Sequence, residues 1–179
     1  EEKPKPEASL WQKMTGTEPK AEAPSRFTVD AGNLKSEFKP LAEGLTITVE
    51  KKTFTITPEG AKNATPEQLD DRSVIYRDVW KDTDIIYEMR GESIKEIIVL
   101  KSKDAKANYR FNVKDAKLIA HPSRNGELAI EGLSEDYSFS SLTLDLQDRG
   151  VISEQRVTQT AGKDGKSINV IMDANWLKK

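Results

Sequence analysis

Residues 84–100 read Asp-Ile-Ile-Tyr-Glu-Met-Arg-Gly-Glu-Ser-Ile-Lys-Glu-Ile-Ile-Val-Leu, two apolar runs joined by a short polar break. In this break, Arg90-Gly91-Glu92-Ser93, glycine takes the first central position of a two-residue turn, as a type II′ β-hairpin requires. The stretch therefore predicts an antiparallel hairpin in a defined register. We expect Met89 opposite Ile94, Glu88 opposite Lys95, Tyr87 opposite Glu96, Ile86 opposite Ile97 and Ile85 opposite Ile98.

The predicted hairpin is apolar on both of its faces. Successive side chains of a strand point to opposite sides of a sheet, so the paired isoleucines face different layers of the protein. This pattern is typical of a sheet that is covered on both sides, or nearly so. In the expected register Glu96 shares a face with Tyr87, Ile94 and Ile98, and we therefore expect it to be a partly buried acid.

Short alternating segments extend outward from the hairpin in both directions. β-branched and aromatic residues fill the apolar positions, and turn residues separate the segments. Only 61–71 has a helical pattern, where Thr65-Pro66-Glu67 supports one short N-capped turn. The chain is predicted to be all-β, an antiparallel β-sandwich or strongly curved sheets of about a dozen short strands. The expected strands are 26–30, 45–49, 53–56, 74–76, 84–89, 94–100, 109–113, 117–119, 127–130, 138–146, 151–158 and 167–172.

The first 24 residues differ in composition from the rest. They are rich in Pro, Glu, Lys and Ala, and such a composition cannot bury enough apolar surface to offset the loss of chain entropy on folding. We expect a disordered Pro/Glu/Lys-rich linker at 1–24 and a β-sandwich domain at 25–179. One alternative stays open, in which Leu10, Trp11 and Met14 form a short amphipathic turn that docks back onto the domain.

Charge and composition exclude several classes of function. The chain has 28 Lys and Arg against 30 Asp and Glu, so it has no strong field to hold a polyanion, and nucleic acid is not an expected partner. The absence of cysteine excludes disulfides, thiolate nucleophiles and Cys-ligated zinc. The longest strongly apolar run, 97–100, is too short to cross a bilayer, so we expect no membrane insertion. Because the chain starts at Glu1, we expect a processed or cloned fragment with any targeting segment upstream.

One region resembles a known family. The stretch Tyr76-Arg-Asp-Val-Trp-Lys-Asp-Thr-Asp-Ile-Ile-Tyr87, followed by Ile94-Lys-Glu-Ile-Ile-Val-Leu100, is similar to a segment of large secreted, wall-associated proteins of Gram-positive bacteria, the RHS or YD-repeat proteins. In those proteins a β-rich module of this pattern lies upstream of the repeats. Three further stretches occur in the family's order: Phe54-Thr-Ile-Thr-Pro-Glu-Gly-Ala61, Tyr109-Arg-Phe111 and Asn175-Trp-Leu177.

The resemblance covers about residues 45–179, the size of one domain. It implies a structural or binding module of a secreted or cell-surface protein, with a role in export, wall association or presentation of a larger polypeptide and with no active site to carry over. The implied partners are downstream domains of the parent polypeptide. Residues 142–150 depart from the family's pattern, which leaves neighbouring surface-protein families open.

The alternative function is carbohydrate binding or adhesion, with cell-wall glycan or a protein of the host as ligand. Sugar faces stack on exposed aromatic rings, and Trp80 lies in an expected turn, where an aromatic side chain is more exposed than in a strand. Tyr76 and Tyr87 in the same stretch are the other candidate ligand-binding residues. Against this, a lone tryptophan in a turn often folds over the sheet edge, and we expect Trp176 to pack in the core.

Acidic residues are the candidate ligands for a metal ion. Asp82 and Asp84 flank a predicted turn and are the candidate calcium ligands, although calcium needs six to eight oxygens and no EF-hand spacing is present. Solvated turn acids are the alternative interpretation. We expect no cofactor, and we expect folding without a metal.

Catalysis is not expected. His121 is the only histidine and precedes Pro122 in a stretch with the composition of a loop, so a loop role is the stronger interpretation. Serines are plentiful, yet no Gly-x-Ser-x-Gly motif accompanies them and no pair of carboxylates is singled out. The sequence offers no activated nucleophile or base.

Overall fold

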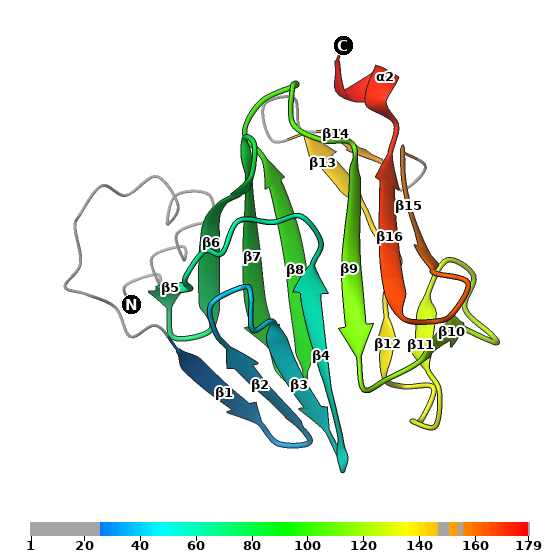
Figure 1. The fold of residues 1–179 in the computed structure, drawn as a ribbon. Helices are drawn as coiled ribbons and strands as arrows, with labels where there is room; N and C mark the ends of the chain where they lie inside the picture. The colour runs from blue at the N-terminus through cyan, green and yellow to red at the C-terminus, as the bar shows by residue number, and fades with distance from the viewer. Residues whose placement is uncertain (1–25, 147–150, 154–155, 179) are drawn as a thin grey trace, which may run out of the picture.

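The computed structural model describes residues 26–146, 151–153 and 156–178. In this part of the chain nearly all regular structure is antiparallel β-strand, and the only helix is a single turn (Figure 1). The sheets pack around one main core, so the predicted all-β, sandwich-like fold is confirmed. Among these residues no helix is long and apolar enough to span a lipid bilayer.

The largest sheet, sheet A, has seven strands and combines hairpins with long-range pairing. Its strands in spatial order are β1 (Phe27–Ala31), β2 (Leu34–Phe38), β3 (Leu45–Val49), β4 (Lys52–Pro58), β9 (Asn108–Lys114), β16 (Ser167–Met172) and β15 (Val157–Ala161). The first four strands follow one another along the chain, whereas β4 pairs with β9, with Thr55 opposite Lys114. The middle of the chain is therefore inserted between two neighbouring strands of sheet A.

Sheet A has an apolar inner face and a polar outer face. Side chains alternate along β3, β4 and β9, so that Phe54 and Phe111 are buried. On the outer face threonines of β3 and β4 lie opposite each other, with the Oγ1 atoms of Thr48 and Thr53 2.9 Å apart. This alternation positions one face for the core and leaves the other to solvent.

The second sheet, sheet B, is built around the predicted hairpin. Its strands in spatial order are β5 (Glu67–Asp70), β6 (Ser73–Trp80), β7 (Thr83–Arg90) and β8 (Ser93–Leu100). All five predicted cross-strand pairs between β7 and β8 are present, so the register is confirmed. Gly91 has a φ of 57° and Glu92 is not among the residues with positive φ, as a type II′ turn requires.

Two smaller sheets complete the described chain. Sheet C contains β10 (Leu118–Ala120), β11 (Leu128–Ile130) and β12 (Ser138–Phe139), and Figure 1 shows it on the side of β15 and β16. Sheet D is the pair β13 (Leu144–Leu146) and β14 (Val151–Ser153). β10 also contacts β15, which joins sheet C to the edge of sheet A.

One core joins sheets A, B and C. It contains Phe38 from sheet A, Tyr76 and Ile85 from sheet B, and Leu118 and Ile130 from sheet C. A separate cluster of apolar side chains lies on the other side of sheet B, which we name the outer face of sheet B. Its buried members are Ile75, Ile86 and Val99, with Leu69 and Ile97 packed against them. Sheet B is thus buried on both faces, as the sequence predicts.

Several elements correct the sequence prediction. The expected strands 138–146 and 151–158 are wrong as single strands, because each range is divided between two strands that belong to different sheets. The helical turn expected at 65–67 is wrong, because residues 67–70 form β5, whose backbone pairs with β6. β2 was not expected as a strand, although its residues alternate between buried and exposed positions.

The helical turn is found near the C-terminus instead, as α2 (Ala174–Leu177). The side chain of Asp173 caps it by accepting the backbone N–H groups of Asn175 and Trp176. Trp176 is half-buried in this turn and packs against the main core, whereas the sequence predicted a position within the core. The linker predicted at 1–24 lies outside the described residues.

Candidate functional site

The three aromatic residues predicted to bind a ligand lie inside the protein. Tyr76, Trp80 and Tyr87 have exposed fractions of 0%, 4% and 2%. The sugar-binding interpretation placed Trp80 in a turn, but β6 continues through this residue and the turn begins only at Lys81. Its burial agrees with the other interpretation, a tryptophan folded against the sheet. In this structure none of the three rings offers a face on which a sugar can stack.

Trp80 closes one end of the core. Its ring centroid lies 4.6 Å from that of Tyr109 and 5.9 Å from that of Phe111, and its Nε1 donates a hydrogen bond to the carbonyl oxygen of Glu59 at 3.1 Å. The ammonium of Lys106 lies 5.9 Å from the indole centroid. The indole therefore joins sheet B to β4 and β9, with both its apolar surface and its polar atom used within the domain.

Tyr76 and Tyr87 form an aromatic group with Phe38. The two tyrosine rings meet edge to face with centroids 6.1 Å apart, and Tyr87 lies 5.7 Å from Phe38. The hydroxyl of Tyr76 donates to the carbonyl oxygen of Lys39 at 2.8 Å. Burial raises the pKa of both tyrosines, so neither hydroxyl ionises near neutral pH.

Glu96 is the partly buried acid that the sequence predicts. It lies opposite Tyr87 on the face of sheet B that is turned toward sheet A. Burial raises the pKa of its carboxyl to about 7, and a hydrogen bond with Tyr87 opposes this shift. The charge of Glu96 in turn adds to the effect of burial in raising the pKa of Tyr87.

The candidate calcium ligands Asp82 and Asp84 lie at the start of β7 and hold the neighbouring loops. Oδ1 of the buried Asp84 accepts hydrogen bonds from the backbone N–H of Asp78 at 2.7 Å and from Nζ of Lys101 at 2.8 Å. Oδ2 of Asp82 accepts the hydroxyl of Ser102 at 2.8 Å. The side chain of Lys101 also donates to Asp78.

A lysine ammonium thus lies among these acids. The hydrogen bond and charge of Lys101 lower the pKa of Asp78. Burial alone would lower the pKa of Lys101, but its bonds to Asp78 and Asp84 outweigh burial and raise it. Within the described segments no group of three or more His, Cys, Asp or Glu side chains is placed to hold a metal ion. Calcium binding by Asp82 and Asp84 stays a prediction.

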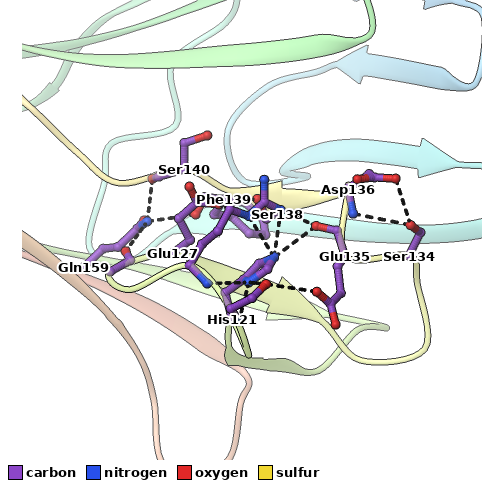
Figure 2. A network of polar contacts seen from close by, with 12 residues as sticks. His121, Glu127, Ser134, Glu135, Asp136, Ser138, Phe139, Ser140 and Gln159 are labelled. Carbon is purple, nitrogen blue, oxygen red and sulfur yellow. Dashed lines mark hydrogen bonds and ion pairs between the residues drawn. The ribbon is translucent and has the colours of Figure 1, made fainter.

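A network of polar contacts surrounds His121 at sheet C (Figure 2). The ring is buried, and its Nδ1 accepts the backbone N–H groups of Ser123 at 3.2 Å and Arg124 at 3.0 Å. Its Nε2 lies 3.1 Å from the carbonyl oxygen of Glu135 and 2.7 Å from Nη2 of Arg124. Nδ1 therefore holds the loop that follows β10 in its own turn, and Nε2 links this loop to the one that follows β11.

This arrangement does not form a serine–histidine pair suited to catalysis. Oγ of Ser123 lies 3.4 Å from Nδ1 of His121 and donates to a carboxylate oxygen of Glu135 at 3.1 Å. Since Nδ1 already accepts two backbone N–H groups, it has no free lone pair to take the serine proton. The loop role expected for His121 agrees with this geometry.

The network also ties sheet C to sheet A. A carboxylate oxygen of Glu127 accepts the hydroxyl of Ser138 at 2.7 Å and lies 3.2 Å from Nε of Arg124. The side-chain amide of Gln159 on β15 donates to the carbonyl oxygens of Phe139 at 3.0 Å and Gly126 at 3.2 Å (Figure 2). These bonds satisfy backbone groups that the short strands of sheet C leave unpaired.

The outer face of sheet A carries two adjoining shallow depressions along β9 and β16. They have volumes of about 410 and 380 Å³, and Arg110 and Asn169 line both. One of them also contains Asn108 and Ile171, whose side chain is 49% exposed. The arrangement offers amide and guanidinium groups beside one apolar side chain, a set that can hydrogen-bond and pack against a polar ligand.

Sequence reasoning missed Lys101, the partners of His121 and the depressions. The hairpin register places Asp84 opposite Val99, so Lys101 two residues further lies on the same face beside it. That signal was present in the sequence. The partners of His121 come from irregular loops, where no periodicity indicates which side chains meet.

Comparisons with known proteins give no relative for this chain. No protein-family model matches it, and neither a curated protein nor a solved structure is significantly similar to it.

Proposed function

We propose that the chain is a non-catalytic structural or binding module of a secreted or cell-wall-associated bacterial surface protein. Downstream domains of the same polypeptide are its proposed partners. The proposal rests on the resemblance to wall-associated RHS or YD-repeat proteins, and on where the residues that carry this resemblance lie in the fold.

One observation carries the structural role. The stretch from Tyr76 to Tyr87 and the stretch from Ile94 to Leu100 form β6, β7 and β8, and their large side chains supply the core of sheet B. A pattern that builds the core specifies a fold and leaves the ligand unspecified. The shared pattern is therefore better explained by a common scaffold than by a common binding site.

The polar clusters support the same interpretation. The acids near Lys101 hold the β6–β7 turn, and the ring of His121 holds the loops of sheet C. In both places the side chains that chemistry would need already bond groups of the domain itself.

The parent gene and its product test this proposal. Its reading frame should continue downstream into Tyr-Asp repeats, and antibodies raised against this chain should detect the parent protein in the wall or culture fraction of the source cells. A parent protein without such repeats, found in the cytosolic fraction, would contradict the proposed family and location.

Carbohydrate binding is the second candidate, and the depressions on sheet A are the observation that favours it. Arg110, Asn108 and Asn169 present donors and acceptors of the kind that sugar hydroxyls bind, and Ile171 adds apolar contact. The site differs from the buried aromatic residues on which the sequence-based hypothesis depended.

Co-sedimentation with purified Gram-positive cell walls tests this second function. Arg110→Ala combined with Asn169→Ala should lower the bound fraction at least fivefold, whereas the control pair Thr48→Ala with Thr53→Ala, elsewhere on the same face, should bind like the unchanged protein. The guanidinium of Arg110 forms an exposed ion pair with Glu59, and the loss of such a pair should hardly affect folding. Equal sedimentation of both variants would exclude this site.

A further inference from the structure

The loop between β10 and β11 contains an exposed Asn-Gly pair. Asn125 and Gly126 lie in a tight turn, which the backbone N–H of Glu127 closes by bonding the carbonyl oxygen of Arg124 at 3.3 Å. Both residues of the pair are exposed, and Gly126 has a φ of 81°. The other six asparagines of the sequence each precede a residue with a side chain. Asn125 is therefore the asparagine whose following peptide nitrogen is not shielded by a Cβ atom.

The described part of the chain holds neither group of this pair in place. Among the described residues, the backbone N–H of Gly126 donates no hydrogen bond, and the side-chain amide of Asn125 makes none. A Cβ atom placed on Gly126 would meet one atom of these residues within 4 Å, Oγ of Ser141 at 3.3 Å. The side chain of Asn125 and the peptide nitrogen that follows it can therefore approach each other without breaking a contact.

We propose that Asn125 is a site of spontaneous deamidation, with water as the co-reactant. The backbone nitrogen of Gly126 loses its proton and bonds to Cγ of Asn125, and the side-chain nitrogen leaves as ammonia, which closes a five-membered succinimide. Water then opens this ring at either of its carbonyl carbons. Cleavage of the new bond to Cγ gives aspartate. Cleavage of the bond to the main-chain carbonyl carbon of Asn125 gives isoaspartate, in which the backbone runs through the former side chain.

A second turn offers similar chemistry but is held in place. Asp164 precedes Gly165, and an aspartate before glycine forms the same succinimide by losing water. Oδ1 of Asp164 accepts the N–H of Lys166 at 2.9 Å, and the N–H of Gly165 donates to the carbonyl oxygen of Gly162 at 2.8 Å. Gly165 is buried, and a Cβ atom on it would lie 2.7 Å from the carbonyl oxygen of Leu118. Ring closure here must first break these hydrogen bonds, so we expect this turn to resist it in the folded domain.

The isoaspartate product weakens a link between sheet C and sheet A. The carbonyl oxygen of Gly126 accepts a hydrogen bond from Nε2 of Gln159 on β15 at 3.2 Å. Isoaspartate adds one methylene carbon to the main chain just before this carbonyl, so the longer turn displaces the oxygen from Gln159. The modification thus loosens the contact as the protein ages. This inference does not depend on a role at the cell wall.

The variant Asp164→Asn tests the role of the structure, because it gives both turns an Asn-Gly pair. The folded full chain is incubated at mildly alkaline pH, and peptide mapping by mass spectrometry follows conversion at both positions. Position 164 should convert at least tenfold more slowly than Asn125, a difference of about 1.4 kcal/mol in activation free energy. In concentrated urea the two rates should become similar. Equal rates in the folded protein, or faster conversion at position 164, would overturn the proposal.

The unchanged chain gives a second, independent readout. After the same incubation, an isoaspartyl methyltransferase should label the peptide that contains Asn125, and the midpoint of urea denaturation should fall. The matched control is Asn125→Gln, because the longer side chain closes its ring far more slowly. This variant should take up no label at that position and should keep its midpoint. An unlabelled wild-type peptide, or an equal fall of the midpoint in both proteins, would overturn the proposal.

Discussion

Glu96 shows how a single side chain couples this fold to pH. Its carboxyl lies on the inner face of sheet B beside Tyr87, where water solvates a negative charge poorly. The same burial that raises its pKa to about 7 makes the folded state hold a proton that the unfolded chain releases near pH 4.5. The folded domain therefore loses stability as the pH rises between these two values.

Glu96→Gln should remove this pH dependence. Below pH 4.5 the residue is protonated in both states, and above about pH 7 it is ionised in both, so its effect changes only between them. Relative to the variant, the free energy of unfolding of the wild type should fall by about 1–3 kcal/mol over this window. Urea denaturation at a series of pH values measures it.

Glu88→Gln is the matched control for this experiment. Glu88 lies on the neighbouring strand, and its carboxylate bonds the exposed Arg90. The difference in free energy of unfolding between the wild type and Glu88→Gln should stay nearly constant over the same pH range. Parallel curves for the wild type and the Glu96 variant would show that the Glu96 carboxyl is hydrated in the folded protein.

Some properties of single residues follow from the sequence, and others do not. The partial burial of Glu96 followed from the hairpin register alone, because a strand's alternation assigns each residue to a face. The expected position of Trp80 in a turn was wrong, since it depended on where β6 ends, and the pairing of Trp80 with Thr83 sets that end. Sequence patterns locate strand ends poorly because tertiary packing decides them.

At the scale of the element, the turn of the β7–β8 hairpin depends on one backbone angle. Gly91 has a φ of 57°, and a Cβ atom at this position would meet no other atom within 4 Å. A substitution here is therefore penalised only by its backbone conformation, without a steric clash. Substitutions at Gly91 therefore measure the effect of backbone conformation on stability without a change in packing.

Gly91→Val should lower the free energy of unfolding by about 1 kcal/mol or more, because a β-branched residue is strained at positive φ. Gly91→Asn should cost clearly less, since asparagine tolerates this region. Thermal or urea denaturation of the two variants compares them directly. A valine variant as stable as the asparagine variant would mean that the turn relaxes to another type.

The elements that sequence missed share a physical cause. β5 is an edge strand of 4 residues with two half-buried members, so it has little apolar alternation of its own and forms because β6 offers it backbone partners. The strand β2 does alternate, but Ser36 takes a buried position where an apolar residue would be expected. In both elements tertiary pairing outweighs the local signal.

At the scale of the whole molecule, the sheet order could not be read from the sequence. The fold class follows from alternation repeated along the chain, which is a local property. The pairing of β4 with β9 and of β9 with β16 joins segments far apart, and no local pattern states which strands become neighbours. The depressions along β9 and β16 depend on this pairing, so the sequence could not predict them either.

The domain should fold without a metal ion. Its described core is continuous across three sheets, and the acids proposed as calcium ligands already bond Lys101 and Ser102. Addition of EDTA should therefore leave the melting temperature unchanged in differential scanning calorimetry. A fall of several degrees that calcium reverses would assign an ion to Asp82 and Asp84.

The insertion of sheet B between β4 and β9 has a consequence for the order in which the chain folds. About 50 residues separate these two neighbouring strands, and closing so long a loop costs chain entropy before any of their contacts form. Sheet B consists of hairpins between successive strands and can form as soon as Leu100 has left the ribosome. Once formed, it brings the ends of β4 and β9 together, so synthesis from the N-terminus favours early pairing within β1 to β4 and within sheet B, and late completion of sheet A by β9, β16 and β15.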